Sequence, residues 1–131
     1  MARESRRRPI LEPGLIVWAE IVDPQGRNPK ARPVVLLTGK EDTRADDPLT
    51  AVAITATLPK PLPDFYVLLP WHRSGHPMTG LKKRCAAACN WIAEVQQSVD
   101  LEVIGRLPDQ HFADVLAAIK RFRDHEDPAT S

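Results

Sequence analysis

The sequence predicts a mainly β fold, a small barrel or sandwich, with one helix near its C-terminal end. Thirteen prolines interrupt short hydrophobic runs along the 131 residues, which argues against a helical bundle. In several of these runs the residues alternate between two faces with a period of two, which is typical of strands. The segment after Pro108 instead carries apolar residues at helical spacing. A chain of this length is expected to form one domain with its own core.

The first two expected strands lie on either side of a tight turn. Residues 15–22 alternate, with Leu15, Val17, Ala19 and Ile21 on one face and Ile16, Trp18, Glu20 and Val22 on the other. Asp23-Pro24-Gln25-Gly26 has the composition of a β-turn. The second strand, residues 33–38, is apolar throughout and is therefore expected at the centre of the sheet.

Three more strands and the helix follow. Strands are expected over residues 50–58, which would place Thr55 and Thr57 on one face, over 65–69, and over 84–95 with a bend near Asn90. Pro108 suits the first position of a helix, and Asp109 suits its first turn. The stripe expected to pack on the sheet consists of Phe112, Val115, Leu116, Ile119 and Phe122.

The two ends of the chain are expected to lie outside the core. Residues 1–12 read as a basic flexible tail and residues 125–131 as a polar tail, which leaves a domain over 13–124. The sequence contains no run of 18 apolar residues, and its basic start lacks the hydrophobic region of a signal peptide. We therefore expect a cytoplasmic protein.

Positive charge is clustered although the net charge is only +1. Two basic loops are expected, one with Arg27, Lys30 and Arg32 and one around Arg73, Lys82 and Lys83. Together they could cradle a polyanion. Each cluster taken singly is equally compatible with charge exposed to solvent.

Arg32-Pro33 is the most informative dipeptide of the chain. Proline pushes the preceding residue into an extended conformation and can begin a strand without donating to the ladder. This would mount a permanently charged, exposed guanidinium at a strand entrance, which suits the binding of phosphate. Alternatively, Arg32 is an ordinary residue at the solvated end of a loop.

Two histidines and two cysteines are of the residue types that bind zinc, but the strand expected over the cysteines argues against a shared zinc site. His72, His76, Cys85 and Cys89 have ligand chemistry. However, two cysteines four residues apart in a strand are about 13 Å apart, so they are better read as buried thiols. The histidines could act as acid and base or simply be exposed. Trp18, Trp71 and Trp91 could stack bases, although core or subunit-interface roles are the default.

Taken together, these residues resemble the MazF/PemK toxins of bacterial toxin–antitoxin modules from about residue 14 to residue 122. The matching segments are Gly14 to Trp18, Asp23-Pro24, the basic loop closing on Arg32-Pro33, Ile54-Thr55, Gly80 to Lys83 and Ile104 to Leu107. Their order and spacing agree with the family. The sequence differs from the family at Ala53, Ala56, Asn90 and Trp91. At these positions the family commonly has proline, a polar residue, an acid and glutamine, respectively.

The resemblance implies an SH3-like barrel with a C-terminal helix, usually a homodimer, that is inhibited by a cognate antitoxin. It also implies cleavage of single-stranded RNA without a metal or other cofactor, in which the 2′-hydroxyl attacks the adjacent phosphate. Arg32 is carried over as the principal catalytic residue and Thr55 as its partner. Further RNA contacts are expected from Arg27, Lys30, Thr57, Arg73, His76, Lys82 and Lys83. The alternative is a non-catalytic barrel, either a gyrase-type toxin that binds protein or a degenerate nucleic-acid-binding module.

Overall fold

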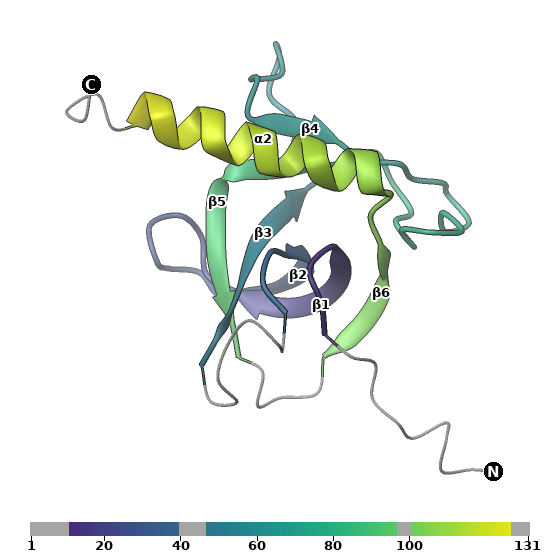
Figure 1. The fold of residues 1–131 in the computed structure, drawn as a ribbon. Coiled ribbons are helices and arrows are strands. Elements are labelled where there is room, and N and C mark those ends of the chain that lie inside the picture. The colour runs from purple at the N-terminus through teal and green to yellow at the C-terminus, as the bar shows by residue number, and fades with distance from the viewer. Residues whose placement is uncertain (1–10, 40–46, 97–100, 127–131) are drawn as a thin grey trace.

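The computed structural model describes residues 11–39, 47–96 and 101–126 (Figure 1). In these ranges six strands precede one long helix. The strands are β1 (Leu15–Ile21), β2 (Lys30–Leu36), β3 (Leu49–Thr55), β4 (Tyr66–Leu68), β5 (Ala86–Val95) and β6 (Glu102–Arg106), and the helix is α2 (Asp109–Glu126). The mainly β prediction with a C-terminal helix is confirmed.

All six strands belong to one antiparallel sheet in the order β4-β5-β3-β2-β1-β6. The sheet curls into an open barrel, and α2 lies across one end of it (Figure 1). Consecutive strands are mostly neighbours, but β6 returns to pair with β1. The curl therefore brings the beginning and the end of the domain together.

Both faces of the central strands are buried, in two separate clusters. Alternate residues of β1, β2 and β3 point into the curl, for example Val17, Val34 and Ala51. The intervening residues, for example Val35 and Val52, share the second cluster with Val115, Ala118 and Ile119 of α2. Burial on both faces explains why residues 33–38 lack alternation, as expected for a central strand.

Several element bounds differ from the prediction. The second strand begins at Lys30 instead of Pro33, because the ladder with β1 extends to the pair Ile21↔Lys30. The third ends at Thr55, so Thr57 lies beyond it, and the fourth is limited to Tyr66–Leu68. Part of the helix stripe was also wrong: Leu116 is 45% exposed, and the buried position beside Val115 and Ile119 is Ala118.

The expected tails fall largely outside the described residues. Residues 1–10 and 127–131 are not described, but Leu11 packs against the inner cluster and Glu12 pairs with Arg106 of β6. At the other end, α2 continues to Glu126. No helix in the described ranges is long and apolar enough to cross a membrane.

Candidate functional site

Arg32 lies inside β2 and not at a strand entrance. It is paired with Ala19 of β1, is partly buried, and has its guanidinium carbon 4.7 Å from the centre of the Trp91 ring. The prediction of an exposed position was wrong because the hairpin ladder continues past Arg32 and because Trp91 covers it. Within the described part of the chain, Arg32 Nε is buried without a hydrogen-bond partner.

Thr55 is brought opposite Arg32 by the register of β2 and β3. The last pair of this ladder is Val34↔Ala53, and two further residues along each strand lead to Arg32 and Thr55. Pro33 directly precedes Val34 of that last pair, and it has no N–H to donate to a further rung with β3, although it remains paired with Trp18 of β1. The two strands therefore part where the two candidate residues stand.

The Thr55 hydroxyl is oriented by its own loop. Thr55 is 9% exposed, and its Oγ1 accepts a hydrogen bond of 3.1 Å from the backbone N–H of Thr57. A hydroxyl that accepts from the backbone still has its own hydrogen to donate. Thr55 can therefore donate a hydrogen bond to an oxygen bound between the strands.

A cleft of about 660 Å³ opens at this parting of the strands. It receives residues from both faces of the sheet and from the loop before β5. The lining residues that bear on function are Trp18, Arg32, Thr55, Thr57, Lys82, Lys83 and Glu102. Arginine, lysine and hydroxyl groups in one concave site form a surface that fits a phosphate.

A bulge in β5 places Trp91 against Arg32. Val52 pairs with Ile92 while Ala53 pairs with Ala88, so residues 89–91 are left over on the β5 side. Bulges of this kind redirect side chains and are frequent next to functional sites. Trp91 is held there because its indole N–H donates a hydrogen bond of 2.8 Å to the carbonyl of Val22. The predicted bend near Asn90 is confirmed, but the contact with Arg32 was not foreseen.

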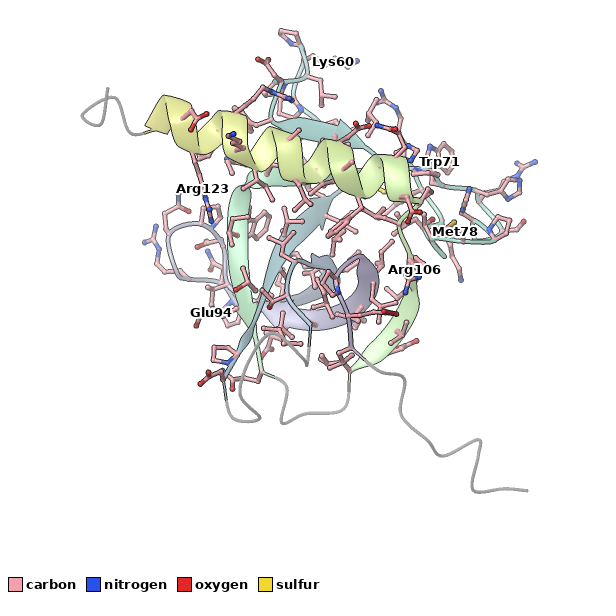
Figure 2. The ribbon with its side chains drawn as sticks, in the orientation of Figure 1. Lys60, Trp71, Met78, Glu94, Arg106 and Arg123 are labelled. Carbon is pink, nitrogen blue, oxygen red and sulfur yellow. The ribbon has the colours of Figure 1, made fainter. Side chains whose placement is uncertain are left out.

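The two lysines of the cleft are carried by the long loop between β4 and β5, which also holds Trp71 and Met78 (Figure 2). This loop lies directly against β6: a Cβ on Gly80 would come within 2.5 Å of the Ile104 carbonyl oxygen. Gly80 also has a φ of 73°, which disfavours other residues. Ile104 itself is the extra residue of a second bulge, opposite Ile16 and Val17. Glycine at 80 thus allows the lysine-bearing segment to close the cleft.

The structure brings only some of the predicted site residues together. Arg32, Thr55, Thr57, Lys82 and Lys83 share the cleft, whereas Arg27, Lys30, Arg73 and His76 do not line it. Arg27 belongs to the β1–β2 connection, which is organised by Asp23, and Lys30 is the first residue of β2. The Asp23 carboxylate accepts hydrogen bonds from the backbone N–H groups of Arg27 and Gln25 and from the Asn28 side chain. These bonds, that from Arg27 foremost, lower the pKa of Asp23.

The histidines and cysteines have structural surroundings. Nδ1 of His76 accepts hydrogen bonds from the N–H groups of Met78 and Thr79, and Nδ1 of His72 accepts one from Ser74. Cys85 and Cys89 are buried core thiols, as predicted. Burial raises the pKa of Cys85 to about 11 and that of Cys89 to about 12. No three His, Cys, Asp or Glu side chains of the described segments could hold a metal ion together.

The profile of one protein family matches residues 12–122, which is most of the chain. Its members are the PemK-like, MazF-like toxins of type II toxin–antitoxin systems. The protein belongs to this family. Arg32, Thr55 and the remainder of the cleft all fall within the matched residues, so the site is part of the family domain.

Solved structures of similar fold agree with this assignment. MazF from Deinococcus radiodurans is 18% identical, with a TM-score of 0.66 over 88% of this chain and 97% of that one. MazF in a MazE–MazF complex from the same organism has a TM-score of 0.61 at 19% identity, over 88% and 97% of the two chains. An endoribonuclease from a mycobacterial species, solved with its cognate antitoxin, has a TM-score of 0.57 at 17% identity over 84% and 91%. No curated protein matches by sequence.

Proposed function

We propose that this toxin is an endoribonuclease that cuts single-stranded RNA by attack of a 2′-hydroxyl on the adjacent phosphate. The observation that carries the proposal is the convergence of Arg32 and Thr55 in one cleft, at the point where the β2–β3 ladder ends. Membership of a toxin family and the similar fold of a mycobacterial endoribonuclease support it.

In the proposed reaction the 2′-oxygen forms a bond to phosphorus and the bond from phosphorus to the 5′-oxygen breaks. The 2′-hydroxyl loses its proton and the departing 5′-oxygen gains one, leaving a cyclic phosphate and a 5′-hydroxyl. Negative charge builds up on the non-bridging oxygens in between. Arg32 stabilises this charge, and Thr55 donates a hydrogen bond to one of the oxygens.

The surroundings of Arg32 suit this role. Its Nε–H is buried without a hydrogen-bond partner, which is costly, and the side chain lines the cleft where a phosphate would lie. Arginine is a poor proton acceptor, so we assign it charge stabilisation and not general-base catalysis. Lys82 and Lys83 add positive charge to the same cleft. The chain therefore supplies the cationic groups that the phosphorane requires, and we propose that no metal is needed.

The test is to incubate the purified protein with a defined RNA in excess chelator and to analyse the product ends. We expect a 2′,3′-cyclic phosphate and a 5′-hydroxyl at each cut. Replacing the 2′-hydroxyl of the nucleotide before the cut with hydrogen should abolish cleavage at that site alone. Intact RNA under all conditions would favour the non-catalytic toxin instead.

We further propose a two-fold dimer and a cognate antitoxin as partners. Apolar side chains remain exposed on one part of the molecule, since Leu68, Trp71 and Met78 are each 40% to 43% exposed. Exposed apolar groups of this size commonly mark protein contacts. Light scattering at micromolar concentration should give twice the chain mass, and a monomer would contradict the dimer.

A further inference from the structure

Three side chains form a row across the strands at the end of the cleft beyond Arg32. Trp18 of β1 is paired with Pro33 of β2 on one side and with Glu102 of β6 on the other. Residues directly opposite in neighbouring antiparallel strands point to the same face, with Cβ atoms about 5 Å apart. Trp18 and Glu102 therefore lie side by side, and both line the cleft.

The exposure of Trp18 requires an explanation. Its strand is second from the edge of the sheet, and most residues of that strand are buried, yet Trp18 is 45% exposed. A tryptophan ring buries a large apolar area when it is covered, so an open ring in the cleft offers apolar surface that a ligand can cover. An exposed aromatic ring in a cleft can serve as a stacking surface for a ligand.

Among the described residues that line the cleft, Glu102 is the one carboxylate. Within the described ranges it forms no ion pair or side-chain hydrogen bond. A carboxylate repels phosphate, so it is unsuited to holding the RNA backbone. It is suited to accepting hydrogen bonds from the edge of a base.

We propose that Trp18 and Glu102 form a nucleobase subsite that selects guanine. The base stacks on Trp18, and its edge meets the carboxylate of Glu102. Guanine presents two adjacent N–H donors on its Watson–Crick edge, which match the two oxygens of a carboxylate. Adenine and cytosine place an acceptor beside their amino group, and uracil flanks its single N–H with two carbonyls. The subsite gives the proposed ribonuclease a base preference.

The spacing is compatible with one nucleotide. Neighbouring strands are about 4.8 Å apart, so the row from β2 to β6 spans on the order of 10 Å. Arg32 adjoins Pro33 and points to the opposite face of the sheet, but the cleft receives side chains from both faces, so a phosphate near Arg32 and a base near Glu102 can belong to the same or adjacent nucleotides. Recognition of unstacked bases by an aromatic platform and hydrogen bonds to their edges is general for single-stranded RNA.

The proposal rests on the proposed RNA substrate, and a binding experiment keeps it separate from cleavage. The probes are labelled uridine heptamers with 2′-fluoro sugars, which lack the attacking hydroxyl, and with guanine, adenine, cytosine or uracil at the centre. Fluorescence anisotropy should show guanine bound roughly 10-fold more tightly than uracil. Glu102→Gln should reduce this preference to about 2-fold or less, since an amide offers only one acceptor oxygen.

Trp18→Ala should weaken binding of all four heptamers by about 5- to 100-fold, and Trp18→Phe should restore most of it. Glu94→Gln on β5, which does not line the cleft, is the charge-matched control and should leave all four affinities unchanged. An unaltered guanine preference in Glu102→Gln, or unaltered affinities in Trp18→Ala, would overturn the subsite. Base-dependent binding that follows these variants, without RNA cleavage by the wild type, would uphold the subsite and refute the nuclease.

Discussion

At the scale of single residues, the central feature is an arginine held by an aromatic ring. The Arg32 guanidinium lies over Trp91, and Trp91 is anchored by its bond to the Val22 carbonyl. A guanidinium over an aromatic face is attracted to the ring, which restricts its orientation while its N–H groups remain donors to a phosphate.

Arg32→Ala should reduce the rate of RNA cleavage by about 100-fold or more, because one donor to the transition state is lost. Thr55→Val should cost less, since it removes a neutral donor and preserves the shape. Arg123→Ala, at an exposed residue of α2 outside the cleft, is the control and should change the rate little. Single-turnover kinetics on one oligonucleotide measure all three, and wild-type rates in Arg32→Ala would contradict the assignment.

Trp91→Ala should lower kcat by roughly 10-fold with a smaller change in KM, because Arg32 remains but is no longer oriented. Trp91→Phe keeps a ring under the guanidinium and should recover most of the loss. A merely structural role would instead change the unfolding midpoint without this difference between kcat and KM. Steady-state kinetics and urea unfolding of both variants distinguish the two cases.

At the scale of elements, the site depends on interruptions of the sheet. The β2–β3 ladder stops at Pro33, β5 bulges at residues 89–91, and β6 bulges at Ile104. Each interruption frees backbone or side chains that a regular ladder would occupy. The loop between β4 and β5 then closes the cleft by packing against β6 at Gly80.

Gly80→Ala should lower the free energy of unfolding by about 1–3 kcal/mol and also impair cleavage. Its new methyl group would meet Ile104 in a backbone conformation that disfavours alanine. Gly26→Ala is the control, because Gly26 has a similar φ of 80° but nothing within 4 Å of the added Cβ. Urea unfolding should show a larger loss at position 80, and equal losses would mean that the contact with Ile104 is unimportant.

The core between α2 and the sheet makes stability sensitive to alkaline pH. Unfolded thiols ionise near pH 9, whereas burial keeps Cys85 and Cys89 protonated to about pH 11 and 12. The folded state then holds more protons, so the free energy of unfolding falls as pH rises above about 9. Urea midpoints at pH 7.5 and 10 should differ more for the wild type than for Cys85→Ala/Cys89→Ala. If the midpoint changed equally in the wild type and the double variant, the loss of stability at alkaline pH would be due to other groups.

At the scale of the whole molecule, the arrangement of charge matters more than its sum. A net charge of +1 gives no general attraction to nucleic acid, but Arg32, Lys82 and Lys83 meet in one cleft. An antitoxin that covers this cleft with an acidic segment would compete with RNA for the same charges. Inhibition and substrate binding would then share one electrostatic surface.

Lys82→Glu/Lys83→Glu should slow association with the antitoxin more than it speeds dissociation, and it should also reduce RNA cleavage. Raised salt should mimic the change in the wild type. Lys120→Glu/Arg123→Glu reverses the same charge on exposed residues of α2 and serves as the control. If neither the charge reversal at Lys82 and Lys83 nor raised salt changes the antitoxin kinetics and RNA cleavage, the antitoxin binds outside the cleft.

Local patterns determined the fold class, the order of the elements, the family resemblance and the candidacy of Arg32 and Thr55. Alternation, proline positions and helical spacing act over a few residues, so they can be read along the chain. Even so, the environment of Arg32 and the exposure of Leu116 were misjudged. Those depend on which distant segments pack against each residue.

Only the tertiary structure decided which residues share the cleft. Trp91 reaches Arg32 through a bulge in another strand, and Trp18 meets Glu102 because β6 returns to pair with β1. It also separated Lys82 and Lys83, which line the cleft, from Arg27, Lys30, Arg73 and His76, which do not. The physical reason is that strand register and sheet curvature are set by the whole core at once, so no local pattern carries them.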